Sequence, residues 1–258
     1  MGLNLVLPAA GAGKRFREVG FNIAKPLIPV HGIPMIIWVL ANFPIERFSK
    51  IWIIAQKKDM IVTSLSPVLN SIAEKIEFIE IDKVTDGPAC TLGLALEQMN
   101  PDDAIISANT DQYVFNGLDS YVDSVMDQSF AGSVLTMSAS GNAWSYVGRN
   151  ATGGVERIVE KVEISDEATV GIYGWSKVSH AIESIEAMKI AGDRVNNEFY
   201  VGPSYNYLIS NNLKINTKHV GKHGKSVHGL GVPIDLQNFL ARPDTLELAE
   251  YCRKKLGL

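Results

Sequence analysis

The sequence predicts an α/β fold in which helices cover both faces of a mostly parallel sheet. Short apolar, β-rich segments alternate with amphipathic segments along the first half of the chain, and this alternation is typical of such folds. The length of 258 residues is enough for one large core. After about residue 130 the β-rich segments follow one another more closely, so we expect the sheet to become mixed there. We therefore predict a single domain over residues 1–258, with halves at about 1–130 and 131–258.

The first half is predicted to contain four strands and two long helical segments. Each strand is marked by a short β-rich run, and each helix by an amphipathic segment. The strands are expected at 3–7, 51–55, 76–81 and 104–108, and the helices at 60–72 and 89–98. In an open parallel sheet, ligands bind at the carboxyl ends of strands where the strand order reverses. Gly11, Arg15 and Asp111 follow strands that end at this edge, so we expect them to lie near one another.

The second half is predicted to carry the rest of the binding site. Its strands are expected at 132–138, 155–160 and 170–175, and a final helix at about 244–256 follows Pro243. A basic cluster at 218–225 places His219 and His223 four residues apart, a spacing that could bind a metal on a helix. Gly221 and Gly224 argue against a helix, so we predict a solvated loop instead.

Composition excludes several function classes. The formal net charge is −4, whereas proteins that wrap nucleic acid carry a basic face. No apolar run reaches the roughly 18 residues that a membrane span needs, and the N-terminus lacks the features of a signal peptide. Two cysteines are too few for a disulfide framework, which fits a reducing compartment. We expect a cytoplasmic protein that binds neither nucleic acid nor membrane.

The most informative segment begins where the first strand ends. It holds the small residues Ala9, Ala10, Gly11, Ala12 and Gly13, followed by Lys14 and Arg15. Small residues let a ligand approach the backbone closely, and amides in such a turn can donate to phosphate oxygens. A guanidinium can bind two phosphate oxygens at once. The segment therefore predicts phosphate binding, although the two glycines alone fit a tight turn without a ligand equally well.

Two common phosphate motifs come close to this segment and fail. The Walker A pattern requires Ser or Thr after Gly-Lys, and this chain has Arg15 there. The dinucleotide pattern requires a third glycine where this chain has Phe16. The site is therefore of another kind.

Lys25 is the second candidate cation. Pro26 and Pro29 are expected to prevent a helix and to hold the segment extended, so that Lys25 points in a fixed direction. A fixed lysine suits a position opposite a phosphate. The alternative is a surface lysine before a proline kink.

Three further segments carry candidate groups. Asp111 follows a predicted strand and could coordinate Mg²⁺, although an aspartate in a turn is common. Gly87 precedes Pro88 at a helix start and could approach a base or ribose. Glu160 and Lys161 end a predicted strand, where a surface ion pair is the alternative.

Together these segments resemble the signature of the sugar-phosphate nucleotidylyltransferases. The first part of the signature is Gly11-Ala-Gly13-Lys-Arg15, Ala24-Lys25-Pro26-Leu27 and Gly32-Ile-Pro34-Met35. The likeness continues in the family's order through ANTDQ at 108–112, WSY at 144–146, EK at 160–161, GIY at 171–173, NEFY at 197–200 and GLGVPID at 229–235. It is closest to the bacterial branch that makes activated precursors for capsule and surface polysaccharide.

The resemblance implies a Rossmann-like, mixed and mainly parallel sheet flanked by helices, the nucleotide-diphospho-sugar transferase fold. It implies Mg²⁺ as cofactor with Asp111 as ligand, and Arg15 and Lys25 as catalytic residues. The implied nucleotide-binding residues are Ala9, Ala10, Gly11, Ala12, Gly13, Lys14, Gly87, Pro88, Ala89 and Asn109. The implied acceptor-binding residues are Tyr146, Glu160, Lys161, Tyr173, Asn197 and Glu198.

The chain departs from the family pattern at two places. Ala24 stands where the family usually has proline. Gly229 stands where the family usually has a second metal-binding aspartate, and Asp235 follows several residues later.

The implied reaction joins a nucleoside triphosphate to a sugar 1-phosphate or a similar phosphorylated acceptor and releases pyrophosphate. One alternative is a cytidylyltransferase for a non-sugar acceptor. A glycosyltransferase of related fold is another, although such enzymes commonly show Asp-x-Asp where this chain has Asn109-Thr-Asp111. A non-catalytic nucleotide-binding subunit is the third. The sequence favours no base among CTP, UTP, dTTP and GTP, and it leaves a homo-oligomer open.

Overall fold

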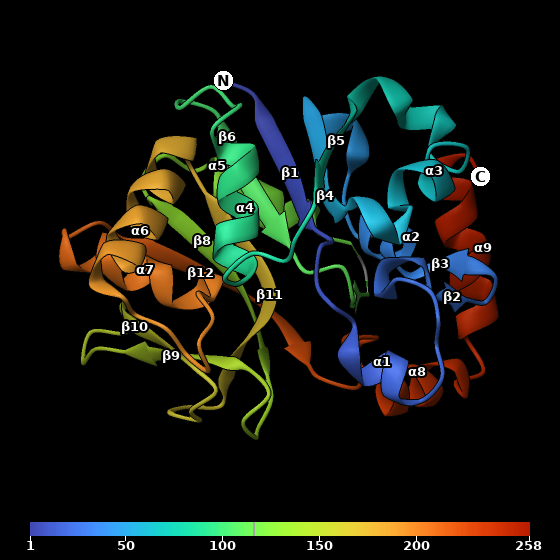
Figure 1. Cartoon of the computed structure of the whole chain (residues 1–258). Helices are drawn as coiled ribbons and strands as arrows, with labels where there is room; N and C mark the ends of the chain where they lie inside the picture. Colours follow the sequence, from blue (N-terminus) through green and yellow to red (C-terminus); the bar gives the residue numbers. More distant parts are fainter. Residues whose placement is uncertain (116) are drawn as a thin grey trace.

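A nine-stranded mixed sheet forms the centre of the described residues, 1–115 and 117–258, of this computed structural model (Figure 1). The strand order along its main path is β10-β9-β11-β6-β1-β4-β5, and β8 and β12 continue from β11. The α/β class predicted from the alternating segments is confirmed.

The strands of the first half are parallel and lie where the sequence predicts them. They are β1 (Leu3–Pro8), β4 (Lys50–Gln56), β5 (Ile76–Ile81) and β6 (Ala104–Ala108). β1 pairs with both β4 and β6, so the chain first builds the sheet to one side of β1 and then to the other. The strand order therefore reverses between β1 and β6, which is where an open sheet of this kind binds its ligands.

The strands of the second half make the sheet mixed, as predicted. They are β8 (Gly132–Ser138), β9 (Ser145–Arg149), β10 (Val155–Glu160), β11 (Glu167–Trp175) and β12 (Ile215–Lys222). β11 is antiparallel to β6, β8 and β9, while β12 is parallel to β8. The prediction of a loop at 218–225 is wrong in part. The first residues of this segment belong to β12, because pairing with β8 satisfies their backbone groups.

Helices cover both faces of the sheet. On one face lie α4 (Pro88–Leu96), α6 (Val178–Ala191) and α7 (Val201–Ser210). On the other lie α2 (Met35–Leu40), α3 (Ile61–Leu65), α5 (Asp119–Met126), α8 (Pro233–Leu240) and α9 (Thr245–Leu256). Alternating residues of β1 reach the two cores: Leu5 and Leu7 pack on the α2 side and Val6 on the α4 side.

The structure corrects two local predictions for segments that contain proline. The helix predicted at 60–72 ends at Leu65, and a 3₁₀ segment follows at Asn70–Lys75, because Pro67 cannot continue the helical hydrogen bonds. The segment Lys25–Leu27 is a single 3₁₀ turn rather than an extended run. Pro26 is tolerated there because the first turn of a helix needs no amide donor from it.

Short elements complete the fold. The small helices are α1 (Lys14–Glu18) and the 3₁₀ turns Ile45–Arg47 and Lys57–Asp59. Two antiparallel ribbons lie outside the main sheet, β2 (Pro29–Val30) with β3 (Ile33–Pro34) and β7 (Gln112–Val114) with β13 (Val227–Gly229). The second ribbon brings the C-terminal segment beside the residues that follow β6. Within the described residues, no helix has the length and apolar character to span a membrane.

Candidate active site

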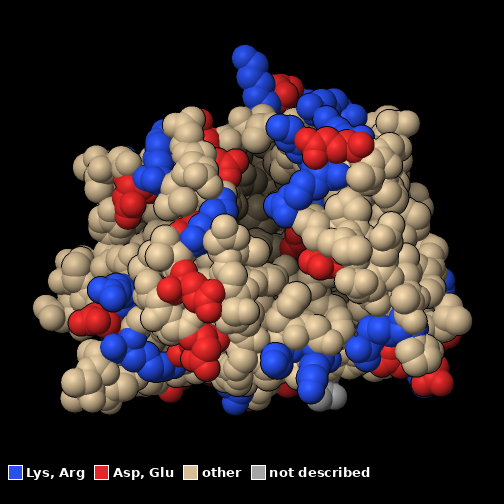
Figure 2. All heavy atoms as spheres, turned by 90° about the horizontal axis from the view of Figure 1, so that it is seen from below, with Lys and Arg blue, Asp and Glu red and all other residues tan. Residues whose placement is uncertain are grey.

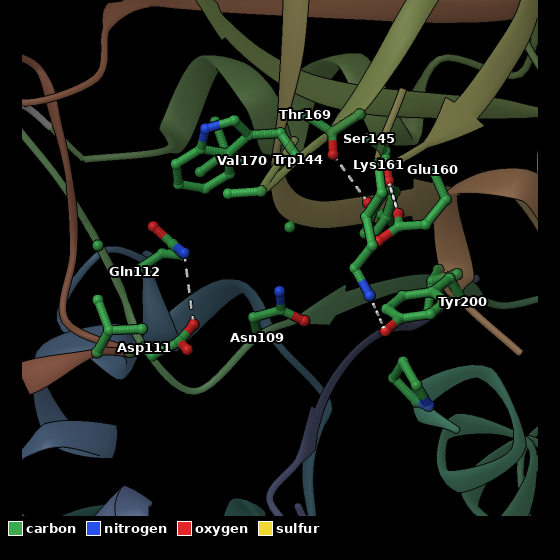
Figure 3. Close-up of a pocket in the computed structure, with 18 of the residues that line it drawn as sticks. Asn109, Asp111, Gln112, Trp144, Ser145, Glu160, Lys161, Thr169, Val170 and Tyr200 are labelled. Carbon is green, nitrogen blue, oxygen red and sulfur yellow. Dashed lines mark hydrogen bonds between the residues drawn. The ribbon is translucent and has the colours of Figure 1, made fainter. Parts of the chain in front are cut away.

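A cavity of about 300 Å³ lies at the carboxyl ends of β1 and β6, between the two halves of the chain. Figure 2 views this side of the molecule and shows a hollow with Lys or Arg side chains at its rim and Asp or Glu side chains beside it. The close-up shows two opposite sides (Figure 3). Asp111 and Gln112 lie on one side, Glu160, Lys161 and Tyr200 lie on the other, and Asn109 lies between them.

The first side is defined by an ion pair between two predicted site residues. Lys25 Nζ donates to Asp111 Oδ2 at 2.7 Å, although the residues are 86 positions apart. Both side chains are largely buried, with 22% and 15% of their surfaces exposed. The 3₁₀ turn directs Lys25 toward the end of β6, so the fixed direction predicted for this lysine is achieved by a turn instead of an extended segment. Arg15, from α1, lines the same cavity.

The glycine turn that precedes α1 is open to solvent. Gly11 and Ala12 are exposed, and within the described residues no backbone acceptor reaches the amides of Gly11, Ala12 or Gly13. Gly13 has φ 62°, the left-handed region that favours glycine, and its backbone packs against Lys25. Such a turn presents amide donors to an anion.

The residues before this turn hold it in place. The amide of Ala9 donates to the carbonyl oxygen of Ile54 at 2.7 Å, and the side-chain amide of Gln56 donates to the carbonyl oxygen of Ala10 at 2.8 Å. Ala9 and Ala10 therefore anchor the turn to β4. Lys14 is exposed and is not among the residues that line the cavity.

The loop before α4 approaches the protein's own backbone. Gly87 has φ 131°, and a Cβ added there would lie 2.6 Å from the backbone nitrogen and oxygen of Phe199. Around it, the Phe199 amide donates to Asp86 at 2.8 Å and the Ala89 amide donates to Phe199 at 3.1 Å. The sequence predicted that Gly87 approaches a ligand closely, and in the structure Gly87 lies close to the backbone of Phe199. The contact of this loop with Phe199 joins the two halves of the chain. Pro88 lines the cavity, and Ala89 is buried.

Asn109 lies where a second pair of backbone segments, those at 109 and 171, approach each other closely. Its amide donates to the carbonyl oxygen of Gly171 at 2.9 Å, and a Cβ added at Gly171 would lie 2.3 Å from Asn109 Nδ2. Gly171 has φ 83° and lies where the pairing of β11 with β8 is irregular. This irregularity lets the Asn109 side chain lie between the two sides of the cavity.

The second side of the cavity is a chain of hydrogen bonds. Lys161 Nζ donates to the hydroxyl of Tyr200, and that hydroxyl donates to Glu198 Oε2 at 2.7 Å. Lys161 Nζ also lies 4.2 Å from the centre of the Tyr200 ring. The ammonium group is thus held by an oxygen and an aromatic face at the cavity wall.

Glu160 is a buried carboxyl group beside this chain. It is 7% exposed and accepts a hydrogen bond from the Ser145 hydroxyl. Burial raises the pKa of Glu160 above its ordinary value, while the Ser145 hydrogen bond and the Lys161 charge oppose that rise. Burial also raises the pKa of Tyr173 to about 12, and its hydroxyl lies 2.9 Å from Thr169 Oγ1. Tyr173 therefore stays neutral as a hydrogen-bonding group.

Three residues implied for the acceptor are not brought to the cavity wall. Tyr146 is fully buried and its hydroxyl donates to the Gly141 carbonyl oxygen at 2.5 Å. Asn197 is exposed, and its carbonyl oxygen accepts from Arg194 at 3.1 Å. Glu198 reaches the site only through Tyr200.

Several cavity residues were missed by sequence reasoning. They are Gln112, Ser145, Thr169, Gly231 and Asp235. One signal could have found Ser145: in a β9–β10 hairpin it pairs with Glu160, so both side chains leave the same face. The others depend on the distant β7–β13 pairing or on the irregular part of β11.

Comparison with known proteins identifies the family. A model of the nucleotidyl transferase family matches residues 4–197, which is most of the chain, so the chain belongs to this family. It is a nucleotidyltransferase. No curated protein sequence matches it significantly.

Solved structures share the fold. A nucleoside-diphosphate-sugar pyrophosphorylase from Vibrio cholerae RC9 aligns with a TM-score of 0.81 at 21% identity, over 92% of this chain and 100% of the other. An inositol-1-phosphate CTP transferase from T. maritima aligns with a TM-score of 0.73 at 15% identity, over 98% of this chain and 96% of the other. The predicted fold is thereby confirmed.

Proposed function

We propose that this chain transfers a nucleotidyl group from a nucleoside triphosphate to the phosphate of a small acceptor, a sugar 1-phosphate or a similar polyol phosphate. The observation that carries the proposal is the placement of cations around one cavity. The Lys25–Asp111 pair lies beside the open glycine turn, Arg15 lines the cavity, and Lys161 lies on the side opposite Asp111. Two phosphorylated substrates therefore have separate cationic partners.

The reaction requires alignment and charge neutralisation rather than a general base. A phosphate oxygen of the acceptor attacks the α-phosphorus, the bond from that phosphorus to the bridging oxygen breaks, and pyrophosphate leaves with the electron pair. The attacking oxygen is already ionised near neutral pH, so no proton has to be removed. Arg15 neutralises the β- and γ-phosphates as charge builds on them, and Lys25 contacts the α-phosphate.

A divalent cation fits the same side of the cavity. Asp111 offers a carboxylate, and the neighbouring Gln112 offers a buried amide oxygen that lacks a hydrogen-bond donor among the described residues. Mg²⁺ prefers such oxygen ligands together with phosphate oxygens. When bound, Mg²⁺ supplies further neutralisation of the triphosphate.

The opposite side is proposed to bind the acceptor. Lys161 contacts the acceptor phosphate, and Glu160 accepts hydrogen bonds from its hydroxyl groups. Ser145 and Tyr200 hold these two side chains in position. The similar structures support this assignment in general terms, because one is a pyrophosphorylase for nucleoside-diphosphate sugars and another uses inositol 1-phosphate.

The second of these structures also favours a cytidylyltransferase for a non-sugar acceptor as the alternative. The ordered likeness of the motifs to the capsule branch supports a role in making precursors for capsule or surface polysaccharide.

A matrix of substrates tests the proposal. CTP, UTP, dTTP and GTP are each incubated with glucose 1-phosphate, inositol 1-phosphate or phosphocholine in the presence of Mg²⁺, and pyrophosphate is measured. We expect release with one triphosphate and one acceptor class, and none when the acceptor is omitted. The Lys25→Ala variant controls for contaminating enzymes. If no pair releases pyrophosphate but a nucleoside-diphosphate sugar donates its sugar, the protein is a glycosyltransferase and the proposal is wrong.

A further inference from the structure

Two glycines form the cavity wall beside Asp111. β13 pairs with β7 so that Gly229 lies opposite Gln112, and the Leu230 amide donates to the carbonyl oxygen of Asp111 at 2.7 Å. The Asp111 side chain fills the space in front of Gly231, where an added Cβ would lie 2.0 Å from Asp111 Oδ2. A side chain is therefore excluded at 231, and the Asp111 carboxylate lies directly against this wall.

The space in front of Gly229 is different, because two oxygen atoms face it without filling it. A Cβ added at Gly229 would lie 3.5 Å from Asp235 Oδ2, 3.7 Å from Gln112 Oε1 and 3.8 Å from His223 Nε2, which are ordinary contact distances. Asp235 belongs to the first turn of α8 and lines the cavity. Its carboxylate therefore reaches the place that a side chain at position 229 would occupy.

Gln112 gives an independent indication that a ligand binds here. Its side chain is only 6% exposed, and Oε1 has no hydrogen-bond partner among the described residues. Its Nε2 donates to Asp111 Oδ1 at 3.4 Å, so the nitrogen faces Asp111 (Figure 3). The oxygen faces the space in front of Gly229, which Asp235 Oδ2 also faces. Buried acceptors are nearly always satisfied, so this oxygen calls for a donor or a cation.

We infer that Asp235 and Gln112 Oε1 complete a divalent-cation site with Asp111, in place of the carboxylate absent at Gly229. The inference rests on the proposed function, because Mg²⁺ is commonly held by one or two carboxylates together with substrate phosphates. Within the described residues, no three His, Cys, Asp or Glu side chains form a metal site by themselves. The amide oxygen is thus the third protein group of the site, and α8 supplies the second carboxylate.

Binding of Mn²⁺ to the full chain, followed by electron paramagnetic resonance without substrate, tests the site. We expect Asp235→Asn and Asp111→Asn each to weaken Mn²⁺ binding on the order of 10-fold or more, since even indirect partners of a metal contribute that much. The matched control is Asp119→Asn, which changes an exposed aspartate in the first turn of α5, outside the cavity. It should bind Mn²⁺ as the wild type does.

A second variant restores the missing carboxylate. Gly229→Asp in the Asp235→Asn background should recover Mn²⁺ binding, because a Cβ at position 229 makes only ordinary contacts and points toward Gln112 Oε1 and the side chain at 235. The inference is overturned if the wild-type chain has no Mn²⁺ site, or if Asp235→Asn binds Mn²⁺ normally while Asp111→Asn does not. Pyrophosphate release is measured separately. Mn²⁺ binding that depends on Asp235, without transfer from any triphosphate, would leave this site in place and refute the proposed function.

Discussion

The two sides of the cavity are built in opposite ways. On the triphosphate side, the glycine turn is exposed, and within the described residues its amides at Gly11 to Gly13 have no backbone partner. On the acceptor side, Glu160 accepts from Ser145, and Lys161 donates to Tyr200, which donates to Glu198. The amide donors of the first side are available to a ligand, whereas the side chains of the second side are already held by hydrogen bonds within the protein.

This difference indicates how specificity and catalysis are divided. A preorganised group loses little entropy on binding and favours a ligand of matching shape, so the acceptor side is expected to select its substrate. The open turn is proposed to bind phosphates, which every nucleoside triphosphate carries. Four substitutions or conditions test the contrast, from the largest expected effect to the smallest.

Removal of the central cation should have the largest effect. Lys25→Ala is expected to lower kcat for pyrophosphate release on the order of 10²-fold or more, because a positioned charge on the transferred phosphate is lost. Asp111→Ala should lose turnover similarly. Both should remain folded by circular dichroism. Lys57→Ala, which removes an exposed lysine from another 3₁₀ turn, is the control. Near-normal turnover by Lys25→Ala would refute its role.

Substitution of two glycines, one at a close backbone contact and one in the open turn, should affect the free energy of unfolding differently. Gly87→Ala should lower the free energy of unfolding by about 1–3 kcal/mol, because φ 131° and ψ 171° are accessible essentially to glycine alone. The added Cβ would also meet the Phe199 backbone at 2.6 Å. Gly11→Ala, where no atom lies within 4 Å of the added Cβ, should leave stability unchanged. Urea denaturation measures both, and equal values for the two variants would contradict this account.

Removal of the Tyr200 hydroxyl should raise the KM for the acceptor and leave the KM for the triphosphate unchanged. Tyr200→Phe keeps the ring beneath Lys161 but removes the hydroxyl that links Lys161 to Glu198. We expect the acceptor KM to rise up to about 10-fold, as loss of a hydrogen bond to a charged group implies, with the KM for the triphosphate unchanged. Tyr207→Phe is the control, because it removes a hydroxyl of a half-buried α7 tyrosine that donates to Asp193 at 3.4 Å, away from the cavity lining. A rise confined to the triphosphate KM would reverse the assignment of the two sides.

The smallest effect concerns Glu160 and pH. Because burial raises its pKa, the native state keeps this proton to higher pH than the unfolded chain does. Glu160 therefore reduces stability as pH rises from the unfolded pKa through the raised native pKa. Glu160→Gln should gain stability relative to the wild type across that window and show no further gain above it.

Activity should follow the same titration. In the proposed site the ionised carboxylate accepts hydrogen bonds from acceptor hydroxyls, so kcat/KM for the acceptor should fall as pH decreases through the raised pKa. This acid limb should be missing from the pH profile of Glu160→Gln. An identical profile in both proteins would show that another group titrates.

Local patterns predicted the fold well because strand identity depends on short β-rich runs that the sequence shows directly, as at Ala104–Ala108. They failed at 60–72, where Pro67 overrides the amphipathic pattern. In the site, the placement of Arg15 and Asp111 around one cavity follows from strand ends and could be predicted, whereas the place of Lys25 was implied only by the family resemblance. The positions of Gln112 and Asp235 could not, because they depend on pairing between segments more than 100 residues apart. Tyr146, implied for the acceptor, is instead part of the core.

The ion pair between Lys25 and Asp111 has a consequence for the order in which ligands bind. In the ligand-free protein, Lys25 acts as an internal counter-ion that keeps the carboxylate neutralised. If Lys25 contacts the α-phosphate as proposed, the ammonium group exchanges the Asp111 carboxylate for the phosphate when a triphosphate binds. Nucleotide and divalent cation should therefore bind with positive linkage, each strengthening the other. Cation binding without nucleotide has to compete with a tethered lysine, so Lys25→Ala should bind Mn²⁺ alone more tightly than the wild type does.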